Sequence, residues 1–124
     1  MNEELERGIR ELVGRDPRYL FEGYRFVFEA LEFTVRKAGE RRHVTGRELL
    51  EGIRDYAREQ FGGLARMVLE GWGIRQTSDF GEMVFGLVGA GLMGKTDSDS
   101  KEDFRDVYDF QDAFPIVPPR EPAS

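Results

Sequence analysis

Apolar residues recur along much of this chain at intervals of three and four positions, the spacing that gathers side chains on one face of an α-helix. Between these segments lie glycines and short polar stretches, which are typical of helix ends and turns. The pattern predicts a mainly α fold, a single-domain bundle of about five helices at residues 2–13, 17–37, 45–61, 64–72 and 77–92.

The strongest helical pattern lies at residues 17–37, which we expect to form the central helix of the bundle. Its core seam repeats at steps of three and four and comprises Phe21, Tyr24, Phe28, Leu31 and Val35, and it is widened by Leu20 and Val27. A second apolar stripe, nearly opposite, comprises Tyr19, Phe26, Ala30 and Phe33. The polar arc that remains can form ion pairs four residues apart, namely Arg18–Glu22, Arg25–Glu29 and Glu32–Arg36.

Several helix ends are marked by residues with known capping roles. Thr45-Gly46-Arg47-Glu48 is a capping box, in which the threonine side chain accepts from the backbone N–H near the glutamate and the glutamate reaches back. Gly62-Gly63 is placed to end that helix, and Gly14 is placed to end the first one. Asp16-Pro17 predicts the start of the second helix as N-cap and first-turn proline.

The two shorter helices also have a predicted inward face. In the fourth helix the residues expected to pack inward are Leu64, Met67, Val68 and Trp72. In the fifth they are Phe80, Met83, Val84, Leu87, Val88 and Leu92.

The helical pattern weakens after Gly94. Five apolar residues without a clean period are expected to anchor this segment, and both a short β-hairpin and a short helix fit them: Phe104, Val107, Tyr108, Phe110 and Phe114. Four of the five prolines lie in residues 115–124, which predicts an extended or disordered tail after a single helical domain at 1–114.

Composition removes several classes of site. The 124 residues suit one domain, contain no cysteine and include one histidine, His43. Thiolate zinc sites, iron–sulfur clusters, cysteine nucleophiles and an all-histidine metal site are therefore excluded. We predict no catalytic residue, no metal site and no cofactor. The N-terminus has no signal-peptide pattern and no apolar run approaches ~20 residues, so a cytoplasmic protein without membrane contact is expected.

The net charge of −6 is unevenly distributed. Residues 1–60 hold 12 basic and 13 acidic side chains, whereas residues 97–124 hold 3 and 8. The body of the chain is nearly neutral, which argues against broad nucleic-acid binding through phosphate neutralisation.

One turn nevertheless concentrates positive charge and is the candidate site for an anion or a partner. Its six basic residues fall within twelve positions and are Arg36, Lys37, Arg41, Arg42, His43 and Arg47. They lead into the N-terminus of the third helix, where free N–H groups and the helix dipole also favour an anion. The alternatives are an ordinary solvated turn and a turn neutralised by the acidic C-terminal segment.

Two further patterns do not predict a site. Gly89–Thr96 matches the phosphate-loop pattern GxxxxGK[ST], but it follows a helical rather than a strand pattern and precedes an acidic turn, so we expect no nucleotide binding. Asp97–Tyr108 lacks the glycine and the final glutamate of a calcium loop. The row Asp103, Asp106, Asp109 and Asp112 is interpreted as a solvated face.

Five strings along the chain carry a family resemblance, at residues 26–31, 42–50, 72–74, 79–82 and 106–110. With them the chain resembles, over about residues 5–114, a small family of uncharacterised bacterial proteins known mainly from planctomycetes and verrucomicrobia. That family has no assigned activity, so the resemblance implies no functional residue.

These observations favour a non-enzymatic interaction or regulatory module of the bacterial cytosol, whose partner is a protein, either another chain or a second copy. The first alternative is a nucleic-acid-binding module of helix-turn-helix type that uses the basic turn 36–47 and the third helix, with residues 92–110 as a wing. The second alternative is an enzyme of a type that the sequence does not reveal.

Overall fold

The computed structural model of the chain describes residues 2–39, 44–94 and 100–116. Its longer helices are α1 (Glu3–Arg15), α2 (Phe21–Ala38), α3 (Gly46–Phe61), α4 (Ala65–Gly71) and α5 (Thr77–Gly89). Short elements complete it: the 3-10 helices η1 (Gly62–Leu64) and η2 (Lys101–Phe104), and α6 (Phe110–Ala113). The mainly α fold is confirmed. The described ranges contain no strand, so the β-hairpin alternative for the C-terminal segment is wrong there and the short-helix alternative holds.

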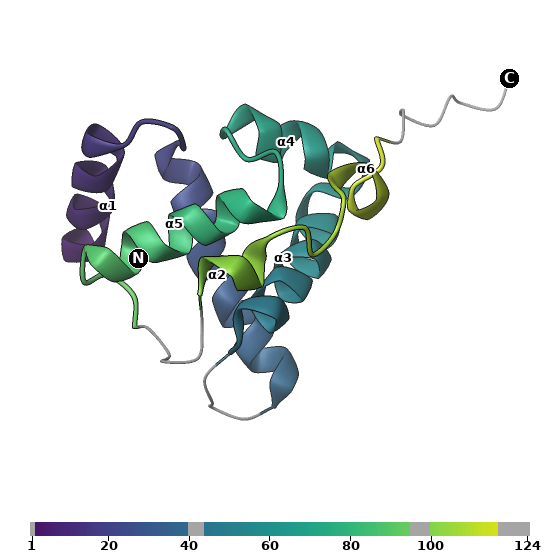
Figure 1. The fold of residues 1–124 in the computed structure, drawn as a ribbon, viewed down its shortest axis with the longest axis horizontal. Coiled ribbons are helices and arrows are strands. Elements are labelled where there is room, and N and C mark those ends of the chain that lie inside the picture. Colours follow the sequence, from purple (N-terminus) through teal and green to yellow (C-terminus); the bar gives the residue numbers. More distant parts are fainter. Residues whose placement is uncertain (1, 40–43, 95–99, 117–124) are drawn as a thin grey trace, which may run out of the picture.

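The helices surround one hydrophobic core. α2 and α3 form an antiparallel pair, and α5 packs against both of them (Figure 1). α1 lies at one edge of the bundle against α2 and α5, while η2 packs on α5 and α3. The expected central helix α2 contacts α1, α3 and α5, and α5 shares this central position because it contacts α1, α2, α3 and η2.

The buried face of α2 is rotated away from the predicted seam. Phe28 and Leu31, which belong to that seam, are only half-buried. The buried apolar side chains of the helix are Tyr24, Phe26, Val27 and Ala30. Because α1 and α5 contact α2 as well as α3, the most protected positions fall between the two predicted stripes rather than along one of them.

Close contacts at three glycines fix how α3 packs. A Cβ at Gly52 would collide with the side chain of Thr34 on α2. At the N-terminal end of α3, a Cβ at Gly46 would lie 2.9 Å from two ring atoms of Phe104. A Cβ at Gly81 of α5 would lie 2.8 Å from the Cβ of Phe104, whose side chain is buried. The Phe104 ring thus holds η2 against the N-terminal end of α3.

The connection between α1 and α2 differs from its prediction. α1 continues through Gly14 and ends at Arg15, and α2 begins at Phe21 rather than at Pro17. Asp16 does not cap α2, because its carboxylate accepts hydrogen bonds from the backbone and side chain of Arg18. Pro17 and Arg18 form a turn, Tyr19 lies in a bend, and α2 starts only after the extended residue Leu20.

Long-range contacts hold the segment between α1 and α2, residues 16–20, in place. The hydroxyl of buried Tyr19 donates to the Asp79 carboxylate at 2.6 Å, which ties the segment to the start of α5. Arg18 contacts Glu82 at 3.4 Å instead of the expected Glu22. Of the three ion pairs predicted along α2, only Glu32–Arg36 is present among the described residues.

The predicted ends of α3 are confirmed. Thr45 Oγ1 accepts from the Glu48 N–H at 3.1 Å, and the Glu48 carboxylate accepts from the Thr45 N–H at 3.1 Å. The helix ends at Phe61, before Gly62.

The predicted inward face of α4 is wrong at two of its four residues. Leu64 and Met67 are exposed, whereas Val68 and Trp72 are half-buried and Trp72 packs against the core. Ala65 and Leu69 are buried instead. Gly62–Leu64 forms a 3-10 turn, so the α-helix starts at Ala65 and its faces are rotated from those expected for one continuous helix.

The C-terminal segment is anchored by aromatic residues, as predicted. Phe104, Phe110 and Phe114 are buried, and Pro115 and Ile116 are exposed. The rest of the predicted tail, residues 117–124, lies outside the described residues. None of the helices in the described ranges is long and apolar enough to cross a membrane.

Candidate functional site

The basic turn is described for three of its six residues. Arg36 pairs with Glu32 on the last turns of α2, and Lys37 Nζ lies 3.1 Å from the Asp55 carboxylate of α3. Arg47, on the first turn of α3, lies 3.9 Å from Glu51. The remaining members Arg41, Arg42 and His43 are outside the described residues.

The environment of Asp55 shows that one of these pairs is electrostatically effective. Burial by itself would raise the pKa of Asp55, but hydrogen bonds from Lys37 and Arg54 outweigh it and hold that pKa below its usual value. The charge of Lys37 is thus already compensated by Asp55 within the chain.

A charged cleft of about 430 Å³ lies at the N-terminal end of α3. It is lined by basic and acidic residues together with the capping threonine: Thr45, Gly46, Arg47, Glu102, Asp103, Arg105, Asp106 and Val107. In the described lining, three carboxylates therefore share the cleft with two guanidinium groups. The acidic C-terminal segment, here Glu102, Asp103 and Asp106, packs beside the start of α3, as expected for a neutralised turn. Among the described residues, however, Arg47 pairs with Glu51 and Arg105 with Glu102, and neither pair crosses the cleft.

The polar groups of the cleft are mostly occupied by local structure. Thr45 is the N-cap of α3, and Asp103 accepts from the Ser100 N–H at 2.7 Å. Asp106 makes no ion pair or hydrogen bond within the described part of the chain, and its backbone φ of 50° lies in the left-handed region that aspartate and asparagine tolerate best among side chains with a Cβ. The cleft holds no described group that is placed as a nucleophile next to a base.

The glycine-rich motif has the context that argues against a phosphate loop. α5 ends at Gly89, so a helix and not a strand precedes the motif, as predicted. Lys95 and Thr96 lie outside the described residues. Within the part of the chain that is described, no three histidine or acidic side chains are grouped so that they could hold a metal ion.

Further polar contacts hold the C-terminal segment in place. The Tyr108 hydroxyl donates to the Leu50 carbonyl at 2.8 Å, and the Arg58 Nε–H donates to the Ala113 carbonyl at 2.7 Å. Burial raises the pKa of Tyr108 well above its ordinary value, so this phenol stays protonated at neutral pH. These contacts are structural.

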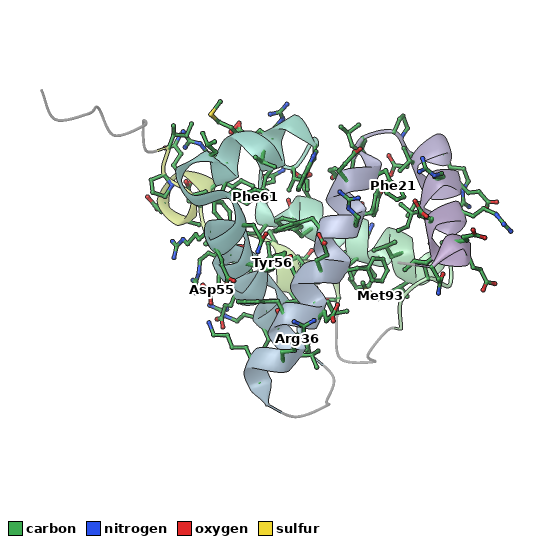
Figure 2. All side chains as sticks on the ribbon, turned by 180° about the vertical axis from the view of Figure 1, so that it is seen from behind. Phe21, Arg36, Asp55, Tyr56, Phe61 and Met93 are labelled. Carbon is green, nitrogen blue, oxygen red and sulfur yellow. The ribbon has the colours of Figure 1, made fainter. Side chains whose placement is uncertain are left out.

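A second surface lies along α2, α3 and α4, where side chains from the three helices form a row of rings. We call it the aromatic strip and define it as the half-buried residues Phe33, Tyr56, Phe61 and Trp72. Figure 2 looks onto this side of the molecule, with Phe61, Tyr56 and Arg36 following one another along the line between α3 and α2. The sequence placed Phe33 on a stripe of its helix but gave no signal that rings from two other helices would join it.

The strip is supported from below by Phe26, which is buried. The Phe26 ring centroid lies 5.4, 5.8 and 5.6 Å from those of Tyr56, Phe61 and Trp72. Phe33 extends the row at 5.2 Å from Tyr56. These tilted and edge-to-face contacts fix the rings, so the parts of them that remain exposed form a preformed apolar surface.

Carboxylates flank the strip. Partial burial, together with the nearby charges of Glu29, Glu59 and Glu32, raises the pKa of Tyr56 above its ordinary value, while Arg36 acts in the opposite direction. Glu29 and Glu59 form no ion pair within the described residues, and no hydrogen bond to the Tyr56 hydroxyl is present there. The strip thus combines ring edges with negative charge that the fold does not neutralise.

Comparisons with protein-family models, with curated proteins and with solved structures gave no match to this chain. The family resemblance of the five sequence strings therefore stays a prediction. The geometry of the charged cleft and of the aromatic strip is the basis for a proposed function.

Proposed function

We propose that this protein is a non-enzymatic interaction module of the bacterial cytosol, and that it binds a partner protein through the aromatic strip. One observation carries the proposal: four large aromatic side chains, from α2, α3 and the end of α4, pack on one another and on buried Phe26 and are still partly exposed. Tyrosine, tryptophan and phenylalanine are enriched at protein interfaces, because each buries a large area at little cost in side-chain entropy.

The nucleic-acid alternative has less support. Lys37 and Arg47 each lie next to a carboxylate of α3, and the cleft at the start of that helix contains Glu102, Asp103 and Asp106. Phosphate groups would meet these negative charges at close range. The enzyme alternative also has less support, because the one hydroxyl among the described residues that line the cleft, that of Thr45, is engaged as a helix cap.

The proposal is tested by photo-crosslinking in cells of the source organism. A photoreactive phenylalanine analogue replaces Tyr56 in one variant and Gln111, an exposed residue of α6, in a matched control. We expect a discrete adduct with another protein from position 56 and none of the same mass from position 111. Irradiated samples that give no adduct at position 56, or the same adducts at both positions, would exclude this surface as the interface.

A further inference from the structure

We propose that the partner segment that binds the aromatic strip is basic, with lysine or arginine side chains that lie along the rings and reach the flanking carboxylates. This inference rests on the proposed function and names the chemistry of the partner. It follows from three properties of the strip: the ring faces, the unpaired carboxylates and a contact that the chain already makes with one of the rings.

The rings favour cations with long aliphatic stems. An aromatic ring carries partial negative charge on its face, so it attracts an ammonium or guanidinium group held above it. The methylene groups of lysine and arginine can at the same time cover the apolar edges of Tyr56 and Phe61. An acidic partner would gain neither contact.

The carboxylates make the net charge around the strip negative. Glu29 and Glu32 lie on α2 and Glu59 lies on α3, and all three act electrostatically on Tyr56. Only Glu32 has an ionic partner in the described part of the chain, namely Arg36, and these two side chains are 65% and 75% exposed. Three carboxylates and one guanidinium thus act on Tyr56, so these charges sum to a net negative charge, which favours an incoming cation.

The chain itself provides an example of the contact. Lys37 Nζ lies 5.7 Å from the centroid of the Phe33 ring while it pairs with Asp55 at 3.1 Å. Here a lysine spans a ring of the strip and a carboxylate of α3 at once. Tyr56, Phe61 and Trp72 have no such cation over them in the described residues, and Glu29 and Glu59, whose charges act on Tyr56, have no ionic partner there.

The charged cleft at the start of α3 serves as the internal reference. Its described lining also contains three carboxylates, but it includes two arginines and no aromatic ring. If negative charge alone recruited a basic segment, the cleft and the strip would compete for it. If ring surface is needed as well, only the strip binds.

The test is a titration of the full chain with a defined probe, a ten-residue peptide of alternating lysine and leucine, followed through the backbone amide signals. We expect shifts confined to residues around Phe33, Tyr56 and Phe61, and weaker binding as salt rises. The double variant Glu29→Gln, Glu59→Gln should raise the dissociation constant by about tenfold, a change that the loss of two exposed ion pairs can supply. Tyr56→Ala should weaken binding at least as much.

The matched control removes two carboxylates elsewhere: Asp106→Asn with Asp112→Asn changes the net charge equally and should leave the dissociation constant unchanged. A peptide with glutamate in place of lysine should not bind. The inference is overturned if the control weakens binding as much as the Glu29, Glu59 variant, if the shifts spread over the acidic segment, or if the glutamate peptide binds equally. A partner crosslinked at position 56 together with any of these results would leave the interaction module standing and remove only its preference for a basic partner.

Discussion

The two ends of α3 carry surfaces of opposite physical character. At the N-terminal end, Thr45 caps the helix, Arg47 lies beside Glu51, and the acidic segment packs alongside. Towards the C-terminal end, Tyr56 and Phe61 are half-buried, and Glu29 and Glu59, whose charges act on Tyr56, have no ionic partner among the described residues. At the first surface basic and acidic side chains are mixed, whereas the second combines aromatic rings with carboxylates that have no ionic partner.

A cluster of charges in a sequence therefore does not by itself mark a binding site. Exposed ion pairs contribute little to stability, yet they lower the potential that a ligand would experience. The basic turn is conspicuous in the sequence because its members are close along the chain. The aromatic strip is inconspicuous because its members come from three helices.

The largest effect is expected beneath the strip. Phe26→Ala should lower the free energy of unfolding by about 3–5 kcal/mol, because the ring is buried and contacts three others. Phe28→Ala should cost clearly less, since Phe28 is half-buried. Urea denaturation of the two variants measures both values. Equal losses, or a larger loss for Phe28, would restore the seam predicted from the sequence as the main buried face of α2.

A smaller effect is expected at the charged cleft. Gly46→Ala places a Cβ 2.9 Å from the buried ring of Phe104, and this crowding should lower stability by about 1–2 kcal/mol. Gly14→Ala in α1 is the control, since nothing lies within 4 Å of its added Cβ, and it should raise stability by about 0.4–1 kcal/mol. A stabilising Gly46→Ala would mean that η2 does not pack against α3 in solution.

Much of the fold could be predicted from the sequence where the determinants are local. The capping box at Thr45 and the glycines after Phe61 fixed the ends of α3, because each acts within one helical turn. The start of α2 could not be found in this way. Asp16-Pro17 has the local signature of a helix start, but residues 17–19 form a turn and a bend instead, and the hydrogen bond of Tyr19 to Asp79, sixty residues away, ties this segment to α5.

The candidate site was predicted less well for the same reason. Periodicity placed Phe33 on a helix face, but no pattern along the chain relates it to Tyr56 or Trp72. Similarly, Lys37 was recognised as part of a basic turn, whereas its partner Asp55 lies on the next helix. The charges could be counted from the sequence, and their compensation depended on the packing of α2 against α3.

The charge at the N-terminal end of α3 should matter little for stability. Arg47→Gln removes an exposed contact of 3.9 Å, in which the side chains are 72% and 54% exposed, so the free energy of unfolding should change by less than about 0.5 kcal/mol. Inorganic phosphate should not shift the backbone amides of Thr45 to Glu48 in the parent protein at low salt. A salt-sensitive shift that Arg47→Gln abolishes would show that this end of α3 binds anions after all.

The smallest effect is a change in the ionisation of Tyr56. Negative charge disfavours the phenolate, so Glu29, Glu59 and Glu32 help to raise its pKa. Glu29→Gln with Glu59→Gln should therefore lower the pKa of Tyr56, and the change should be small because the charges act partly through water. Carbon-13 chemical shifts of the labelled tyrosine ring, followed from pH 8 to 12, measure this value, and Tyr56→Phe assigns the signal. Asp106→Asn with Asp112→Asn removes the same charge at the other surface and should leave the pKa unchanged. An equal fall in both double variants would mean that Tyr56 responds only to the total charge of the protein, and the carboxylates beside the strip would then not be the local partners available to a basic segment.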